Sequence, residues 1–94
     1  MKHFDIRVSG RVQGVGFRFM AVEAARRYHI RGFVKNLWNG SVYIEAEGEE
    51  VDLEDFFRWC RTGPLGARVE NAETTEGTLK HYVSFEIRYS SEIP

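Results

Sequence analysis

The sequence predicts an α+β sandwich in which two helices cover one face of an antiparallel sheet. Two segments space their apolar residues three and four apart, as amphipathic helices do. The segments around them alternate apolar and polar residues, as half-buried strands do. An Asn-Gly pair joins two of these strand segments in the middle of the chain. The resulting order is βαββαβ with an extra short terminal strand, the ferredoxin-like split βαβ arrangement.

The first half of the chain contributes a strand, a loop and a helix. Residues 4–12 alternate, with Phe4, Ile6 and Val8 on one face, and residues 13–16 interrupt them as a loop. The helix is predicted over residues 17–28. Its apolar stripe consists of Phe17, Met20, Ala21, Ala24, Ala25 and Tyr28.

The second half contributes the remaining strands and the second helix. Residues 33–38 and 41–47 form a hairpin, with Asn39-Gly40 as a two-residue type I′ turn. The second helix begins near residue 52 and ends at Gly63-Pro64. Its buried stripe consists of Leu53, Phe56, Phe57 and Cys60. Strands follow at residues 67–75 and 82–89.

Size, charge and cysteine content restrict the class of protein. With 94 residues, the chain is expected to be a single domain, residues 1–94. A net charge of −1 argues against a nucleic-acid-binding protein, which usually carries a basic stripe. Cys60 is the only cysteine, and no membrane-spanning run or signal peptide stands out. We therefore expect a cytoplasmic protein, by default a monomer, with no membrane partner.

Residues 10–18 (GRVQGVGFR) place a glycine-rich loop between a strand and a helix. Glycines let several backbone N–H groups turn toward one point, and the helix N-terminus adds further N–H groups and a positive dipole end. Such a concavity suits a phosphate, and Arg18 could fork onto two of its oxygens. A tight connection with a solvated Arg18 is the alternative. The spacing fits neither a P-loop nor a dinucleotide-binding fingerprint.

Asn36 is the second polar residue that needs an explanation, because asparagine is disfavoured in strands. Its amide can donate a hydrogen bond to one partner and accept one from another, so it can hold a water molecule in a fixed orientation. A strand end with the amide bonded to backbone is an equally good interpretation.

Both segments resemble the two signature stretches of the acylphosphatase family. The first matches through Val8, Gly10, Val12, Gln13, Gly14, Val15, Phe17 and Arg18, and the second through Gly32, Phe33, Val34, Lys35, Asn36, Gly40, Val42 and Gly48. The resemblance implies hydrolysis of the carboxyl-phosphate bond of acyl phosphates to a carboxylate and inorganic phosphate. It implies that Arg18 binds the substrate and that Asn36 orients the attacking water. It also implies that the phosphate lies in the loop formed by Gln13, Gly14, Val15, Gly16, Phe17 and Arg18, with no cofactor and no metal.

Other functions remain as alternatives. Similar domains occur inside larger proteins that process carbamoyl phosphate, and a phosphate-binding domain without turnover is a further alternative. Because the sequence ends at Pro94, we expect a free-standing enzyme. Residues 31–34 faintly resemble an RNA-recognition motif but lack its alternating aromatics. The histidines, His3, His29 and His81, are scattered without metal-ligand spacing, so no metal site is expected.

Overall fold

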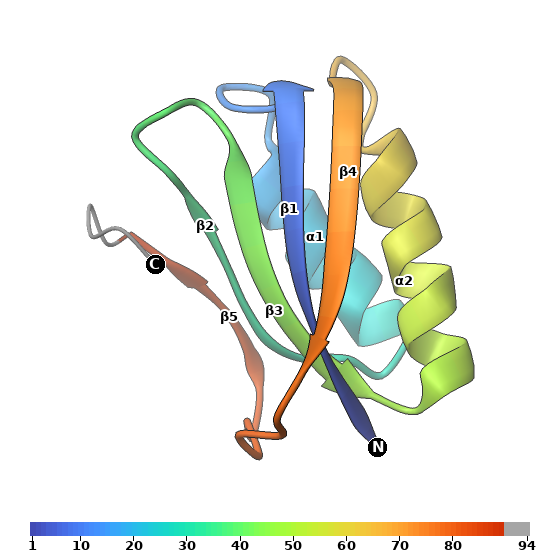
Figure 1. Ribbon diagram of the computed structural model, residues 1–94. Helices are drawn as coiled ribbons and strands as arrows, with labels where there is room; N and C mark the ends of the chain where they lie inside the picture. Colours follow the sequence, from blue (N-terminus) through green and yellow to red (C-terminus); the bar gives the residue numbers. More distant parts are fainter. Residues whose placement is uncertain (90–94) are drawn as a thin grey trace.

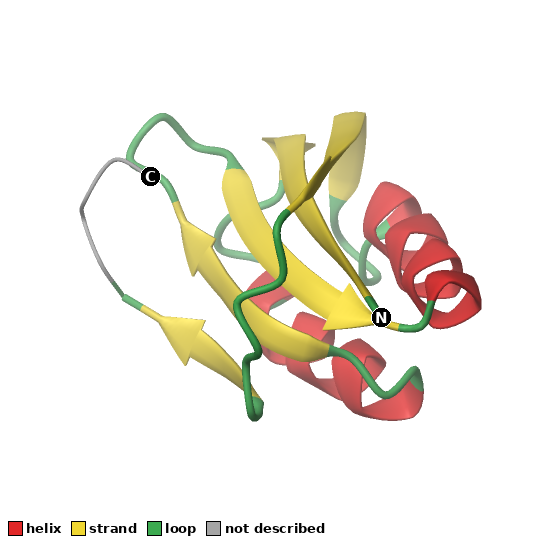
Figure 2. Cartoon of the chain, turned by 60° about the horizontal axis from the view of Figure 1, so that its bottom comes forward, coloured by secondary structure: helices red, strands yellow, loops and turns green. Residues whose placement is uncertain are grey.

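The computed structural model describes residues 1–89 and shows a five-stranded sheet in the order β4-β1-β3-β2-β5. The strands are β1 (Lys2–Arg11), β2 (Arg31–Asn36), β3 (Val42–Gly48), β4 (Arg68–Gly77) and β5 (Phe85–Arg88). The helices are α1 (Phe17–Arg27) and α2 (Glu50–Thr62). Both helices lie on the same face of the sheet, as Figures 1 and 2 show. The predicted βαββαβ order with a short terminal strand is confirmed.

The core lies between the helices and the sheet. Ile6 and Val8 of β1 and Ile44 of β3 point to the helices and are fully buried. On α1, three small alanines, Ala21, Ala24 and Ala25, are fully buried and let the helix approach the sheet closely. On α2, the residues without exposure are Leu53, Phe56 and Cys60. The alternation of β1 and β3 and the helical stripes therefore predicted the core correctly.

The bounds of several elements and the exposure of one side chain differ from the predictions. Met20 is 43% exposed because it lies at the margin of a stripe centred on the alanines. The second helix begins at Glu50, since Glu50 and Asp52 place negative charge in its first turn. The fourth strand continues to Gly77, because it stays paired with β1 as far as His3.

The expectation of an antiparallel sheet is wrong at one edge. The pairings of β1 with β4, β1 with β3 and β2 with β3 are antiparallel, but β5 runs parallel to β2. The reason is topological: β4 ends at the end of the sheet where β2 begins, so a short connection starts β5 in the direction of β2. Residues 82–84, expected in that strand, belong to this connection.

The hairpin turn between β2 and β3 also differs from the prediction. A type I′ turn needs a positive φ at both central residues, yet Gly40, with φ of 94°, is the only residue of the turn with a positive φ. The Gly40 N–H donates to Leu37 O (3.1 Å), and the Leu37 N–H donates to Ser41 O (2.9 Å). The loop is therefore a three-residue connection in which the glycine takes the left-handed position. Asn39 Oδ1 accepts from the Ser41 N–H and hydroxyl and so braces the turn.

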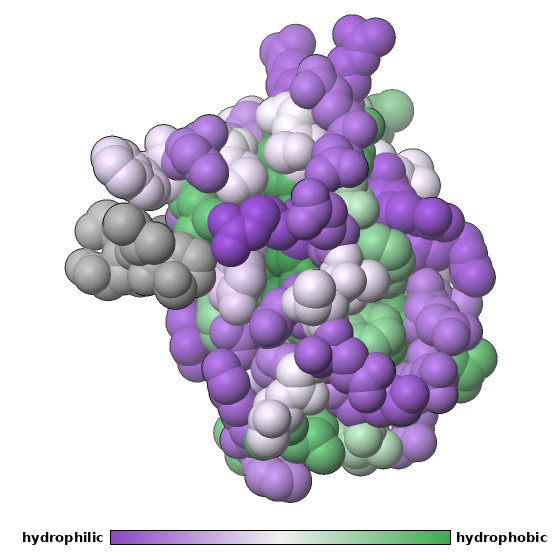
Figure 3. Space-filling view, in the orientation of Figure 1, coloured by the Kyte–Doolittle hydropathy of each residue, from purple (hydrophilic) through white to green (hydrophobic). Residues whose placement is uncertain are grey.

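The connection at residues 78–84 crosses the face of the sheet opposite the helices, as Figure 2 shows. Its Tyr82 packs against a second small apolar cluster, formed by Phe33, Leu37 and Tyr43. Figure 3 looks onto this face, where hydrophilic side chains predominate. The connection buries polar side chains of β1 and β3, so that every residue of β3 is buried.

Four of these polar side chains, His3, Asp5, Glu45 and Glu47, form one network. His3 Nδ1 lies 2.7 Å from Glu47, and His3 Nε2 lies 2.8 Å from Asp5. Burial lowers the pKa of His3, but the hydrogen bonds to the two carboxylates outweigh burial and leave that pKa raised. Burial likewise raises the pKa of Glu47, but backbone N–H groups of the connection and His3 leave it lowered. The network thus stabilises a charged arrangement under the connection.

Candidate active site

The loop between β1 and α1 forms a cradle of backbone N–H groups. Gly14 and Gly16 have φ of 75° and 78°, whereas Val15 between them has no positive φ. This alternation turns successive N–H groups into one concavity, which is an anion-binding arrangement. Within residues 1–89, no backbone acceptor outside the loop takes the N–H groups of residues 14–19. A phosphate placed there would therefore meet several free donors.

Arg18 lies in the first turn of α1, next to this cradle. The helix has no acidic residue in its first turn and Gly16 as its N-cap, so Arg18 adds positive charge to the positive end of the helix dipole. Among the described residues it forms no ion pair. Its guanidinium carbon lies 5.0 Å from the centre of the Tyr89 ring, and such stacking limits the orientations that the guanidinium can take. The arrangement lowers local stability unless an anion is bound, which is typical of a binding site.

Asn36 is the last residue of β2, paired with Val42 of β3. Its side-chain Oδ1 is buried and has no hydrogen-bond partner among the described residues. Buried polar atoms are nearly always paired with protein or with water, and each exception needs an explanation. The interpretation that the amide is bonded to backbone is therefore not supported. A water molecule at this oxygen would satisfy it.

Gln13 connects the cradle to the hairpin that carries Asn36. Its Nε2 donates to Leu37 O at 2.7 Å and to Ser41 O at 2.8 Å. Both protons of the amide are therefore used to join the two loops, which lie at the same end of the sheet (Figure 1). Gln13 was expected in the phosphate-binding loop, and its side chain turns out to position the loop against Asn36.

A hollow of about 210 Å³ lies at this junction. It is lined by Val12, Gln13, Gly14, Gly16, Phe17, Arg18, Phe19 and Asn36. The volume is below the ~300–1,000 Å³ typical of drug-sized ligands. The site thus fits a small molecule, with Arg18 and Asn36 in one pocket.

The predicted site residues contribute in different ways. Gly14, Gly16, Arg18 and Asn36 line the hollow. Phe17 is 2% exposed and packs against Trp59, and Val15 packs against the core, so that their side chains anchor the cradle while their backbone belongs to it. Sequence reasoning missed Phe19, which lines the hollow and is 64% exposed. The signal was its position: an apolar residue after Arg18, outside the stripe of α1.

A comparison with known families decides the relationship. The acylphosphatase family model matches residues 4–87. The chain belongs to the acylphosphatase family. A similar relative is the acylphosphatase of Archaeoglobus fulgidus, 46% identical over 85 residues, covering 90% of this chain and 96% of the relative. The acylphosphatase of Thermotoga maritima is 43% identical over 89 residues, covering 95% of this chain and 99% of the relative.

Solved structures of an acylphosphatase and of HypF share the fold. The Bacillus subtilis acylphosphatase superposes with a TM-score of 0.92 at 38% identity, covering 95% of this chain and 100% of that one. Full-length HypF in its phosphate- and nucleotide-bound form superposes with a TM-score of 0.87 at 36% identity, covering 93% of this chain but 12% of that one. The predicted fold class and acylphosphatase function are therefore confirmed. Among the described residues, no helix is long and apolar enough to cross a membrane.

Proposed function

We propose that this acylphosphatase hydrolyses acyl phosphates in the hollow at the β1–α1 loop. The phosphoryl group would lie in the backbone cradle, Arg18 would pair with its oxygens, and Asn36 would hold the attacking water. The observation that carries this proposal is the buried Oδ1 of Asn36, which has no partner among residues 1–89 and lies in the same pocket as the cradle. This oxygen can accept a hydrogen bond from a water molecule, next to the place where the cradle would hold the electrophilic phosphorus.

The chemistry that these groups must support is modest. The water oxygen forms a bond to phosphorus, and the bond from phosphorus to the carboxyl oxygen breaks, releasing a carboxylate and inorganic phosphate. A carboxylate whose acid has a pKa of ~4 leaves without a proton, so no general acid is needed. Positioning of the water and neutralisation of phosphoryl charge are the main tasks. Among residues 1–89, those that line the hollow include no histidine, aspartate or glutamate, so we propose that a phosphate oxygen takes the water's proton.

The test is phosphate release from benzoyl phosphate in the presence of a chelator. We expect rapid hydrolysis by the wild type, and a loss of about 10²–10³-fold in Arg18→Ala, by analogy with other lost electrostatic stabilisers. Arg26→Ala is the matched control, because Arg26 is an exposed arginine of the same helix, paired with Glu23. Retention of more than half of the activity in Arg18→Ala would remove that residue from the proposed mechanism.

The pH dependence tests the assignment of the proton. Because no histidine lines the hollow in the described part of the chain, kcat is expected to be flat between about pH 5.5 and 8. A bell-shaped profile with a limb near the pKa of histidine, ~6.5, would contradict proton transfer to the phosphate.

The second candidate is the alternative expected from the sequence, a partner domain that processes carbamoyl phosphate; the likeness to full-length HypF, of which this chain covers 12%, supports a role as one domain of a larger protein. Measuring hydrolysis of carbamoyl phosphate beside benzoyl phosphate separates the two. Turnover of benzoyl phosphate by the isolated chain favours the free-standing enzyme. A folded chain that binds phosphate without hydrolysing either compound favours the partner domain.

We further propose that the enzyme is a cytoplasmic monomer, as its sequence led us to expect. The single cysteine, Cys60, is buried in the core and supports a fold made without disulfides. Size-exclusion chromatography with light scattering tests the oligomeric state: a mass near 10.9 kDa is expected, and a mass of twice that value would contradict a monomer.

A further inference from the structure

A second group of functional side chains lies on the sheet face opposite the helices. His3 and Asp5 belong to β1, and Glu45 of β3 is the register partner of Asp5. His3 is 1% exposed and Glu45 is 6% exposed. Neither contributes to the hollow that holds Arg18 and Asn36. We propose that His3, Asp5 and Glu45 form a binding site for a divalent transition-metal ion of the Zn²⁺ type.

The spacing of the donor atoms suits such an ion. His3 Nε2 lies 2.8 Å from Asp5 Oδ1 and 3.6 Å from Glu45 Oε1. One ligand atom from each residue falls within 4.8 Å of the others. Zn²⁺ binds imidazole nitrogen and carboxylate oxygen at ~2.0–2.2 Å in a tetrahedron, which separates neighbouring ligand atoms by ~3.3–3.5 Å. The observed separations bracket this value. Glu45 Oε2 accepts from the Tyr43 hydroxyl. Glu45 Oε1 accepts from the Tyr82 hydroxyl and from Lys80 Nζ, so an ion at Oε1 takes the place of these two donors.

Glu47 supplies the support that a metal-binding histidine requires. Its Oε2 accepts from His3 Nδ1 at 2.7 Å, and this directs His3 Nε2 toward Glu45 and toward Asp5, its hydrogen-bond partner at 2.8 Å. A carboxylate that holds the far nitrogen of the imidazole is the usual second partner of a metal-ligating histidine. Glu47 is itself fixed by the backbone N–H groups of Lys80 at 2.6 Å and Tyr82 at 3.1 Å. The orientation of the imidazole is therefore built into the fold.

The charge of the cluster favours a divalent cation. Asp5, Glu45 and Glu47 are three carboxylates, and Lys80 Nζ, 3.0 Å from Glu45 Oε1, is the one lysine or arginine that pairs with them among the described residues. A divalent ion together with Lys80 balances the three negative charges. Placing opposite charges together in a partly desolvated site is far more favourable than leaving like charges in contact.

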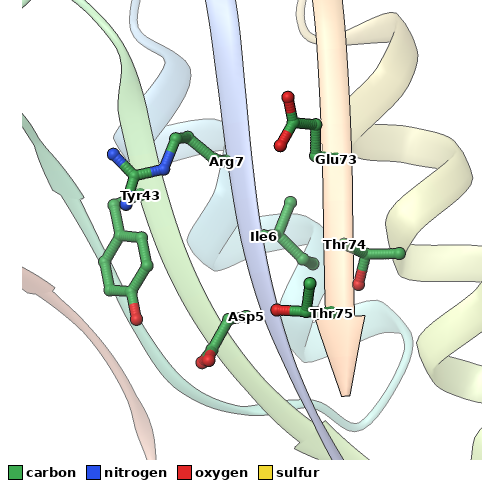
Figure 4. A pocket seen from close by; sticks show the side chains of 7 residues that line it. All are labelled: Asp5, Ile6, Arg7, Tyr43, Glu73, Thr74 and Thr75. Carbon is green, nitrogen blue, oxygen red and sulfur yellow. The ribbon is translucent and has the colours of Figure 1, made fainter. Parts of the chain in front are cut away.

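The site has a route to solvent. The side chain of Asp5 is 37% exposed and lines a hollow of about 360 Å³ with Arg7, Tyr43 and Thr75. Figure 4 shows Asp5, Tyr43 and Thr75 around this opening on the outer face of the sheet. An ion can enter from this side and take a water as its fourth ligand, the arrangement of an open zinc site. Lys80 is 55% exposed, so its ammonium can move aside.

The test is calorimetric titration of the chelator-treated full chain with Zn²⁺, with Co²⁺ absorption as a report on geometry. One equivalent should bind, with the visible spectrum of tetrahedral Co²⁺. Asp5→Asn should bind at least ~10-fold more weakly, because even loss of a supporting group around a metal costs about that much. The control is a double variant, His29→Gln with His81→Gln, which removes the other two histidines. It should bind Zn²⁺ with the affinity of the wild type.

Lys80→Ala separates a metal site from a purely structural hydrogen-bond network. It removes the ammonium that competes for Glu45 but keeps the Lys80 N–H that holds Glu47. We expect tighter Zn²⁺ binding in this variant, at unchanged hydrolysis of benzoyl phosphate. Three results would each overturn the proposal. They are no saturable Zn²⁺ binding by the folded wild type, loss of binding in the double variant His29→Gln with His81→Gln, and binding of Zn²⁺ by Asp5→Asn with wild-type affinity.

Discussion

Replacement of Asn36 by alanine should separate catalysis from stability. In the proposed mechanism the Asn36 amide holds the attacking water, so without the amide kcat should fall about 10²–10³-fold, or ~2.7–4 kcal/mol of transition-state stabilisation. KM should change little, because the cradle and Arg18 remain. Asn36→Ala therefore acts on the chemical step.

The stability of the same variant should hardly change. Asn36 Oδ1 has no protein partner among the described residues, and in the proposed site a water molecule satisfies it. Asn36→Ala therefore breaks no hydrogen bond within the protein and loses only the packing of a half-buried side chain. We expect the free energy of unfolding to stay within about 1 kcal/mol of the wild type.

The two measurements are kinetics with benzoyl phosphate and unfolding in urea, followed by circular dichroism. Asn71→Ala is the matched control, because Asn71 is an exposed asparagine of β4 whose amide donates to Glu73; it should leave both quantities unchanged. A loss of more than ~2 kcal/mol of stability with less than a tenfold loss of kcat would show that Asn36 is structural and would refute the reasoning.

Three further predictions concern other parts of the chain. Gln13→Ala removes the two bonds to Leu37 and Ser41 and should lower both kcat and the free energy of unfolding, the latter by about 1–2 kcal/mol; wild-type kinetics would show that the loops need no such link. Phe56→Ala empties a fully buried position and should cost about 3–5 kcal/mol in urea unfolding; a cost below 1 kcal/mol would mean that the core refills the space. Burial raises the pKa of the Cys60 thiol, so the native protein should resist a thiol-specific alkylating reagent at pH 8 while the urea-unfolded chain reacts; rapid native labelling would contradict the buried position.

The sequence by itself determined the elements whose signals are local. Alternation in β1 and β3 and the alanine stripe of α1 predicted which faces are buried, because side-chain direction follows from the 2.0 and 3.6 periods of strand and helix. The glycine-rich loop and Arg18 could be recognised because the cradle is made of consecutive residues. Asn36 was recognisable as an anomaly of residue type, although local reasoning left its role open.

Only the tertiary structure decided what depends on distant residues. It placed β5 parallel to β2 and turned residues 78–84 into a cover over the sheet, because strand direction depends on where the preceding strand ends. It assigned the Gln13 side chain to the hairpin, 24 residues away. It also brought His3 against Glu47, 44 residues later, which no spacing along the chain reveals. Such contacts arise when strands far apart in sequence pair side by side. The hydrophobic pattern along the sequence does not specify which strands pair.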